Sequence, residues 1–354
     1  MYRSFVLTLA AALAGSLTFS AVPPLALARQ ITIHQHGVPF VPERLLPASH
    51  AASKSDRIVE LFQTIGRTTV WTLVEKVPFE GPFGEPEGIA RIGEDRYFVS
   101  EGEYTAPTVS YNGSIIDGTD RTPGAGTAHI KVFDGKGKLI ADATVSDVGS
   151  NEYHTGGIDY SDGFLWATIA QYRPNSTCHM IRIDPRTLEY KTLFRANDHY
   201  GGSVYDPSAK KLYTLNWGSR NSSTWDLGDK HLIPNRVTAP RKVVRNPSYF
   251  VDYQDCNFLG HPAAYGERAV ALCGGVTGFA NNVKLGGVAI VDLETMVPLA
   301  EVPIMMLSDL GGIVSNNPVD VDVVGGRLRL YFLPDSTNAT LYVYEAQPQS
   351  PYEY

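Results

Sequence analysis

The sequence contains few charged residues and no long run of one charge. Only 19% of its 354 residues are charged and 43% are hydrophobic, a composition that excludes an intrinsically disordered chain and provides for a large core. The net charge is -7 and basic residues do not cluster, so nucleic acid and anionic lipid surfaces are not expected as partners. Beyond the N-terminus no apolar segment approaches the roughly 20 residues of a membrane helix, so no membrane insertion is expected.

Several familiar catalytic motifs are also missing. The sequence has no Gly-x-Ser-x-Gly elbow, no His-Glu-x-x-His, no glycine-rich phosphate loop followed by Lys-Ser/Thr, and no calcium loop of the EF type. These absences disfavour ordinary serine-hydrolase, zincin and nucleotide chemistry. We therefore expect no metal site and no cofactor.

The N-terminus has the features of a secretory signal. Arg3 precedes an apolar run at residues 5–17, and Ala26 and Ala28 form a small-x-small pattern, which predicts a cleaved signal peptide at residues 1–28. Sequons downstream of such a signal predict N-glycosylation and a secretory or extracellular location. Four sequons with a non-proline middle residue lie at Asn112, Asn175, Asn221 and Asn338.

The sequence has only three cysteines. Cys256 and Cys273 flank a segment that reads as a turn between two strands, which predicts a disulfide bond between them in an oxidising compartment. Cys178 is left over in "NSTCHMIRID", where the alternation of apolar residues predicts a strand. This pattern favours a buried structural thiol over a catalytic one.

Helical periodicity is almost absent after the signal. Only residues 53–66 predict one short helix, capped by a serine. The rest consists of short strand-like runs separated by Asp-Gly and Asp-Pro turns, the pattern of an antiparallel all-β domain.

A repeat divides this domain. "HTGGIDYSDGFLWATIA" at 154–170 and "HYGGSVYDPSAKKLYTLNW" at 199–217 align at paired glycines 45 residues apart, and weaker copies lie at 85–102, 253–274 and 317–334. A spacing of about 40–50 residues is typical of a four-stranded propeller blade. Division of residues 68–346 by this spacing predicts a single-domain, six-bladed β-propeller.

The ends of the chain are expected to frame this ring. The C-terminal "TLYVYEA" is expected to pair with the N-terminal "TTVWTLVEKV" and so close the ring. An N-terminal extension at 29–67 and a tail at 347–354 flank the propeller. A β-sandwich or a parallel β-helix is the alternative, but neither accounts for the repeat.

Loops that precede the innermost strands of a propeller converge around its central channel, and such convergence produces binding sites. The residues so placed, with Glu85 and Asn316 beside them, are Glu87, His154, His199, Tyr200, Tyr253, Gln254, Asp255 and Asn317. A second group follows the next strands of two blades, at Tyr172, Arg173, Trp217 and Arg220. Arginine beside aromatic rings suits a planar, electron-rich or anionic ligand.

The repeated residues also have a structural interpretation. His154 and His199 can each bond a neighbouring carbonyl within a blade, and repetition favours architecture. The paired glycines allow the inner strands to approach one another closely at the axis.

Four stretches carry a resemblance to known proteins. "EPEGIA", "YHTGGIDYSDGFLWATIAQYRPNS", "DHYGGSVYDPSAKKLYTLNWGSR" and "NPSYFVDYQDCNFLG" resemble a family of secreted fungal and bacterial β-propellers, most of unknown function. The sequence is similar to its fungal hetero-Diels-Alderases of tropolonic sesquiterpenoid biosynthesis. The resemblance implies a pericyclase without redox cofactor that joins a tropolone quinone-methide to a humulene-type sesquiterpene, both hydrophobic small molecules.

Such a reaction needs a dry cavity and hydrogen-bond donors. Tyr172, Arg173, His154 and His199 are the candidate catalytic donors, and one histidine would act as general acid. The competing hypothesis is a metal-dependent lactonase or hydrolase similar to gluconolactonase-type propellers, with Glu87, Asp255 and Asn317 around a divalent cation. A secreted carbohydrate- or peptide-binding propeller without catalysis is the third.

Overall fold

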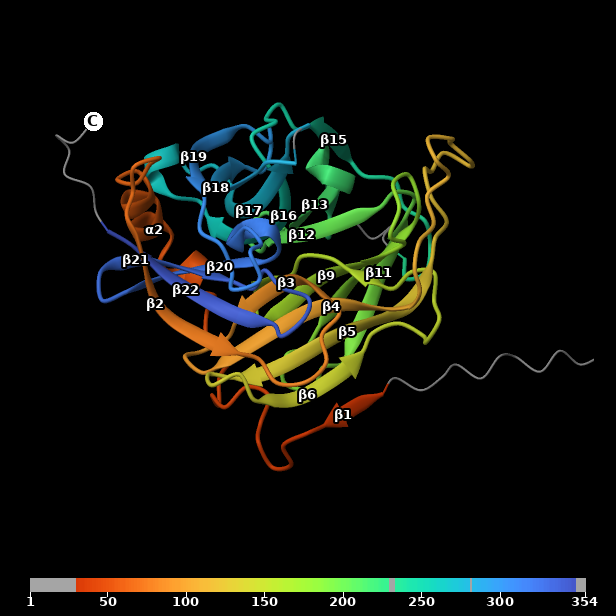
Figure 1. The fold of residues 1–354 in the computed structure, drawn as a ribbon, viewed down its shortest axis with the longest axis horizontal. Helices are drawn as coiled ribbons and strands as arrows, with labels where there is room; N and C mark the ends of the chain where they lie inside the picture. Colours follow the sequence, from red (N-terminus) through yellow and green to blue (C-terminus); the bar gives the residue numbers. More distant parts are fainter. Residues whose placement is uncertain (1–29, 229–232, 281, 348–354) are drawn as a thin grey trace, which may run out of the picture.

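The computed structural model describes residues 30–228, 233–280 and 282–347. The predicted signal peptide and almost all of the predicted C-terminal tail lie outside these residues. Five antiparallel sheets, which we call blades 1 to 5, are arranged around a common centre (Figure 1). The chain is an all-β propeller.

Each of the first three blades runs along the chain from its innermost strand outward, and blade 1 gains a short fifth strand at its outer edge from the N-terminal part of the chain. Blade 1 contains β3 (Glu85–Arg91), β4 (Arg96–Ala106), β5 (Ala125–Asp134), β6 (Leu139–Thr144) and β1 (Ile31–Ile33). Blade 2 contains β7 (His154–Thr155), β8 (Asp159–Ser161), β9 (Phe164–Ala170), β10 (Cys178–Ile183) and β11 (Tyr190–Ala196). Blade 3 contains β12 (Tyr200–Asp206), β13 (Lys211–Asn216), β14 (Asn221–Asp226) and β15 (Lys242–Arg245).

The last two blades follow the same pattern, except that the final one takes its outermost strand from the N-terminal part of the chain. Blade 4 contains β16 (Asp252–Gly260), β17 (Val270–Gly278), β18 (Lys284–Asp292) and β19 (Pro298–Ile304). Blade 5 contains β20 (Val319–Val324), β21 (Arg327–Phe332), β22 (Thr340–Ala346) and β2 (Trp71–Pro78). Short 3-10 turns are η1 (Trp217–Ser219), η2 (Ala263–Tyr265) and η3 (Val314–Asn316).

The predicted number of six blades is wrong, because the described residues form five. The wide interval between Gly88 and Gly156 contains no additional blade. It is lengthened by the loop at residues 107–124, which we call the β4–β5 loop and which projects at the right of Figure 1. The predicted number came from dividing the length of residues 68–346 by the 45-residue spacing, and this division counted the loop as part of an additional blade.

The ring closes where the sequence predicts. Strand β2 pairs antiparallel with β22, with Val77 opposite Leu341. Five buried hydrophobic clusters each lie between two neighbouring blades, and the cluster between blades 5 and 1 includes both of these side chains. Since a buried aliphatic side chain contributes about 1.5–3 kcal/mol, most of the core stabilises blade-to-blade contacts.

The paired glycines bring the inner strands together at the axis. A Cβ atom on Gly156 would lie 2.1 Å from the carbonyl oxygen of Gly201, and the amide of Gly157 donates to that same oxygen at 2.8 Å. No larger residue fits at Gly156, so this part of the repeated phrase is architectural.

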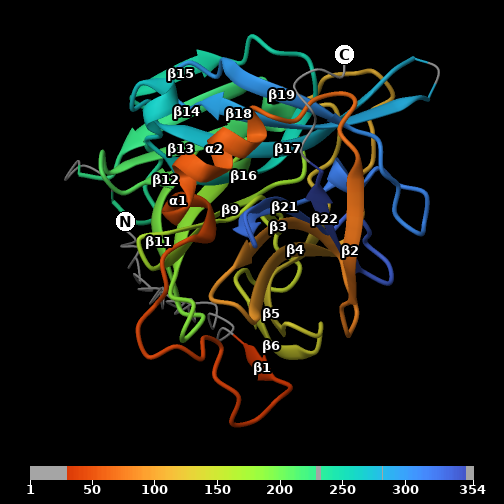
Figure 2. The same ribbon diagram turned by 90° about the vertical axis from the view of Figure 1, so that its left-hand side faces the viewer.

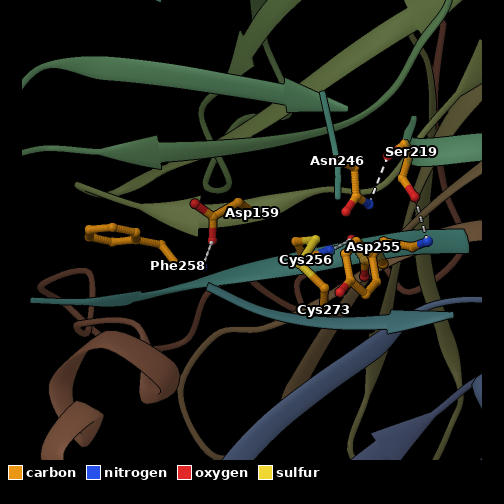
Figure 3. The surroundings of a disulfide bond; sticks show 8 residues. Asp159, Ser219, Asn246, Asp255, Cys256, Phe258 and Cys273 are labelled. Atoms are coloured by element: carbon orange, nitrogen blue, oxygen red, sulfur yellow. Dashed lines mark hydrogen bonds between the residues drawn. A yellow bond between two sulfur atoms is a disulfide. The ribbon is translucent and has the colours of Figure 1, made fainter. Parts of the chain in front are cut away.

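Buried aspartates tie the inner strands to each other. The Asp159 carboxylate accepts a hydrogen bond from the amide of Tyr205 in blade 3 at 3.0 Å. It accepts a second from the amide of Phe258 in blade 4 at 3.1 Å (Figure 3). Asp255 accepts from the amide of Ile89 in blade 1 at 3.2 Å. These contacts satisfy buried inner-edge amides.

Two short helices cover one end of the channel (Figure 2). Instead of one helix at 53–66, the chain forms α1 (His50–Ser53) and α2 (Ser55–Phe62), and the serine cap is Ser49 on α1. The Nε2 atom of His50 lies 2.9 Å from the Gly93 carbonyl, and Nζ of Lys54 donates to Asp322 at 2.6 Å. Only about 10 Å³ of space remains there, so this end of the channel is closed.

The predicted disulfide is present. Cys256 of β16 and Cys273 of β17 face each other as direct cross-strand neighbours and are bonded (Figure 3). Such bonds persist in oxidising compartments. Cys178 is buried, and its burial raises the pKa of the thiol, which makes it unreactive. Within the described residues no helix is both long and apolar enough to cross a membrane.

Candidate functional site

A cavity of about 240 Å³ lies among the inner strands and loops of blades 1 to 4. Its lining includes seven of the residues predicted from the sequence: Glu87, His154, Tyr172, His199, Trp217, Tyr253 and Gln254. Glu85, which the sequence puts at the same channel mouth, lines it as well. Residues from four blades therefore meet in one cavity, as a propeller allows.

Five other predicted residues do not line the cavity. The hydroxyl of Tyr200 pairs with Ser223 at 2.8 Å between blades 2 and 3. Asp255 holds backbone amides at the axis, and Nδ2 of Asn317 donates to the Pro334 carbonyl at 2.9 Å.

The two predicted arginines are engaged in loop contacts. Nε of Arg173 donates to the side chain of Gln171 at 2.8 Å, within its own loop. Nη2 of Arg220 donates to Oδ1 of Asp252 at 2.8 Å, and Asp252 lines the cavity. Neither arginine lines the cavity, so the structure does not place these guanidinium groups where they would bind an anionic ligand inside it.

Sequence reasoning missed Asp252 and Asn216. Asp252 stands one residue before Tyr253 in the fourth repeat, and Asn216 one residue before Trp217. Their positions in the repeat could have indicated a place at the site, because each directly precedes a residue that was predicted there. Which of two neighbouring side chains points into the cavity depends on the pleat of the strand, since successive side chains point to opposite faces.

His154 and Glu87 form a buried pair. His154 begins β7, Glu87 lies in β3, and Nε2 of the histidine is 3.0 Å from Oε1 of the glutamate, an ion-pair contact without good hydrogen-bond alignment. Burial is the largest single influence and lowers the pKa of His154, but the charge and contact of Glu87 together with the charge of Glu85 exceed it and leave the pKa raised. His154 therefore favours the imidazolium form, and its Nδ1 has no hydrogen-bond partner among the described residues.

His199 has the opposite protonation. Its Nδ1 lies 2.7 Å from the carbonyl oxygen of Gln171, and since a carbonyl only accepts, Nδ1 carries the proton and Nε2 keeps a lone pair. Burial and the nearby charge of His154 lower the pKa of His199 to about 3. The two ring centroids are 5.2 Å apart, so a charged and a neutral imidazole share one cavity.

Aromatic rings surround the histidines. The Tyr172 ring stacks on His154 with centroids 4.7 Å apart, and Trp217 meets His199 edge-on at 4.8 Å. Trp217 opens the turn η1, in which Gly218 adopts a left-handed φ of 62° that favours glycine. The guanidinium of Arg121, from the β4–β5 loop, lies 4.8 Å above the Trp217 ring.

Glu85 is the second carboxyl group beside His154. The charge of Glu87 raises the pKa of Glu85, and burial adds to the rise. The hydroxyl of Tyr104 donates to its Oε2 at 3.3 Å. Across the described ranges, no three His, Cys, Asp or Glu side chains are grouped so as to hold a metal ion.

Several solved structures are similar to this chain at low sequence identity. A hypothetical protein from Leishmania major has a TM-score of 0.41 at 9% identity, over 78% of this chain and 91% of that chain. A luciferin-regenerating enzyme has a TM-score of 0.40 at 11% identity, over 79% and 95%. The tail fiber of Staphylococcus aureus phage P68 has a TM-score of 0.42 at 12% identity, over 81% and 54%. At this level of similarity these structures carry no argument.

No curated protein matches the chain. The sequence model of a family of unknown function, DUF6454, matches residues 45–349.

Proposed function

The chain belongs to the DUF6454 family of unknown function, and we propose that it is an enzyme that removes water from a small planar alcohol by acid–base catalysis. One observation carries the proposal: His154, with Nε2 3.0 Å from Oε1 of Glu87, and His199, with Nδ1 2.7 Å from a carbonyl oxygen, stand 5.2 Å apart in one buried cavity. Two titratable groups whose surroundings push their pKa values apart are the usual mark of an acid and its partner base.

His154 is the acid. Its raised pKa keeps a proton available near neutral pH. In the reaction the proton passes to the hydroxyl of the substrate, the C–O bond breaks with both electrons going to oxygen, and water leaves. The carbon that held the hydroxyl is left with positive charge.

His199 is the base. With a pKa of about 3 it is too weak to take a proton from a neutral alcohol, but it can take one from a cation, whose ring hydroxyl has become strongly acidic. Loss of that proton to Nε2 gives a neutral quinone-methide. The proton then returns from His199, the stronger acid, to His154, the stronger base, and the pair is ready again.

The volume of the cavity limits how many substrate molecules it can enclose. Pockets for drug-sized ligands have about 300–1,000 Å³, and about 240 Å³ is available here. One ring fits inside. The narrower form of the proposal is a hetero-Diels-Alderase that dehydrates a hydroxymethyl tropolone in the cavity and leaves the quinone-methide to react with a humulene-type alkene at the open mouth.

The other two candidate functions receive less support. A lactonase that used Glu87, Asp255 and Asn317 as cation ligands would need all three in one place, yet the last two are bonded to backbone groups outside the cavity. A binding protein without catalysis would have no use for a matched pair of oppositely protonated histidines.

The test uses a hydroxymethyl tropolone, with N-acetylcysteine or humulenol present to trap the quinone-methide. Wild-type protein should accelerate formation of the adduct, and His154→Gln should lower the rate about 100-fold or more, the usual contribution of a general acid. Glu60→Gln, an exposed position on α2, is the control and should keep the wild-type rate. An unchanged rate in folded His154→Gln protein would contradict the proposal.

A further inference from the structure

The charges that face the cavity are unbalanced. Three carboxyl groups line it, from Glu85, Glu87 and Asp252, whereas the lining includes one cationic group, the imidazolium of His154. Glu87 is matched by His154 at 3.0 Å, and Asp252 by Arg220 at 2.8 Å. One negative charge is left to account for.

Glu85 is the carboxyl group without a match. Its side-chain hydrogen-bond partners are neutral hydroxyls, that of Tyr104 at 3.3 Å and that of Tyr172. The pKa of Glu85 is raised, first because of the charge on Glu87 and then because of burial, so its negative charge is disfavoured where it stands. A positive charge placed beside it would relieve both effects.

The walls of the cavity also suit a cation. Tyr172 and Trp217 present aromatic rings, and His199 is neutral, so no ring other than that of His154 repels positive charge. Trp217 already holds the guanidinium of Arg121 at 4.8 Å from its ring. Aromatic faces beside a carboxylate are a common way to recognise ammonium groups.

A polar atom near this charge also lacks a partner. Nδ1 of His154 is buried and has no hydrogen-bond partner among the described residues, although His154 is only 4% exposed. As an imidazolium donor it requires an acceptor atom, and an acceptor on a ligand would supply one. The site therefore lacks both a positive charge and a hydrogen-bond acceptor.

We propose that the cavity selects a positively charged group on a small aromatic molecule, with Glu85 as its charge partner and the rings of Tyr172 and Trp217 as its walls. The proposal rests on the proposed function for its catalytic meaning, because departure of a protonated hydroxyl leaves positive charge on the substrate. Carboxyl groups and rings that favour this charge stabilise the transition state more than the neutral alcohol, which is how binding becomes catalysis.

Three ligands of similar size test the charge preference by calorimetry at pH 7: benzylammonium, benzyl alcohol and benzoate. Benzylammonium should bind at least tenfold more tightly than benzyl alcohol, and benzoate more weakly than both. Equal affinities, or tighter binding of benzoate, would overturn the proposal. This comparison uses wild-type protein, so it decides the matter even where a variant fails to fold.

A variant pair assigns the effect to Glu85. Glu85→Gln should remove the preference for benzylammonium, with a loss of about tenfold in affinity, while Glu60→Gln should leave it unchanged. A preference that survives in folded Glu85→Gln would contradict the role of this residue.

Failure of this proposal and failure of the proposed function are distinguishable. Preferential binding of benzylammonium without any tropolone dehydration would leave a cation-binding site and reject the dehydratase. Dehydration that depends on His154, with no preference among the three ligands, would keep the enzyme and reject the cation site.

Discussion

Two histidines at equivalent places in consecutive repeats differ because of one neighbour each. His154 lies against Glu87 and has a raised pKa, whereas Nδ1 of His199 is bound to the Gln171 carbonyl and burial lowers its pKa to about 3. The sequence interpretation that each histidine bonds a carbonyl within its own blade fits neither residue fully: His199 does bond a carbonyl, but that of Gln171 in the neighbouring blade 2. His154 lies instead against a carboxylate of blade 1.

The pH dependence of the proposed reaction follows from His154. Because the acid form is lost as pH rises through its raised pKa, the rate should fall on the basic side, above about pH 6.5, the unperturbed value for histidine. Glu87→Gln removes the charge that raises this pKa and leaves burial, so the fall should move to lower pH by about one unit or more. A pH–rate profile measures it, and an unmoved profile would rule out Glu87 as the cause.

Acid stability should depend on His199. Its pKa is about 3 in the folded protein and about 6.5 unfolded, so the unfolded state binds a proton that the folded state does not once the pH drops below 6.5. Stability is therefore lost as the pH falls from 6.5 towards 3, by about 3 kcal/mol at pH 4.5.

The variant that removes this sensitivity is His199→Asn. Its amide nitrogen retains a donor for the Gln171 carbonyl without a titratable ring. Urea unfolding at pH 7 and pH 4.5 should show a smaller loss in the variant than in wild-type protein. Equal losses would mean that His199 does not set the acid limit.

Two adjacent glycines test access to the base. A Cβ atom on Gly201 would lie 3.0 Å from Nε2 of His199, with no atom outside that ring within 4 Å, whereas one on Gly202 would meet nothing closer than 3.8 Å. Gly201→Ala should therefore fold, cover the lone pair and lower the dehydration rate at least tenfold, while Gly202→Ala should keep it. Melting temperatures of both variants are the control, and equal rates would count against His199 as base.

At the scale of strands and loops, the sequence predicts the strands and their pairing more accurately than the lengths and directions of the loops. Alternating apolar residues and turn dipeptides predicted the strands, the closing pair β2 and β22, and the bond between Cys256 and Cys273, because strand pairing follows local pattern. The length of the β4–β5 loop led to the wrong number of blades, because the division by a 45-residue spacing counted the loop as part of a blade. Arg173 and Arg220 were predicted in the site because they follow strands, but their directions depend on loop hydrogen bonds that no periodicity encodes.

Sequon accessibility differs between elements. Asn112 and Asn338 lie exposed at turns, whereas Asn221 begins β14 and its sequon residues Ser222 and Ser223 are buried within blade 3. An oligosaccharide needs an accessible loop, so expression through a eukaryotic secretory pathway should give glycans at Asn112 and Asn338 and none at Asn221. Peptide mass spectrometry before and after deglycosylation measures occupancy, and a glycan at Asn221 would contradict the expectation.

The molecule as a whole is a ring of five blades, and each buried hydrophobic cluster is shared by two neighbouring blades. The site depends on this arrangement, because Glu87, His154, His199 and Tyr253 come from blades 1, 2, 3 and 4 and meet only when the ring is closed. One mouth of the channel is sealed by α1, so the ligand has the other mouth for entry. The sequence could not tell the two mouths apart, since the sealing contacts join residues far apart in the chain, such as Lys54 and Asp322.

Opening the ring at its closing strand should therefore unfold all blades together. Val77 is 4% exposed between blades 5 and 1, so Val77→Asp buries an unpaired charge there and should lower the free energy of unfolding by about 3 kcal/mol or more. Val74→Asp lies on the same strand at a 40% exposed position and should change stability by less than about 0.5 kcal/mol. Circular dichroism and tryptophan fluorescence should report one coincident transition for Val77→Asp, because the cores are shared around the ring. Two separate transitions, or equal effects of the two substitutions, would show that the blades are stable without closure.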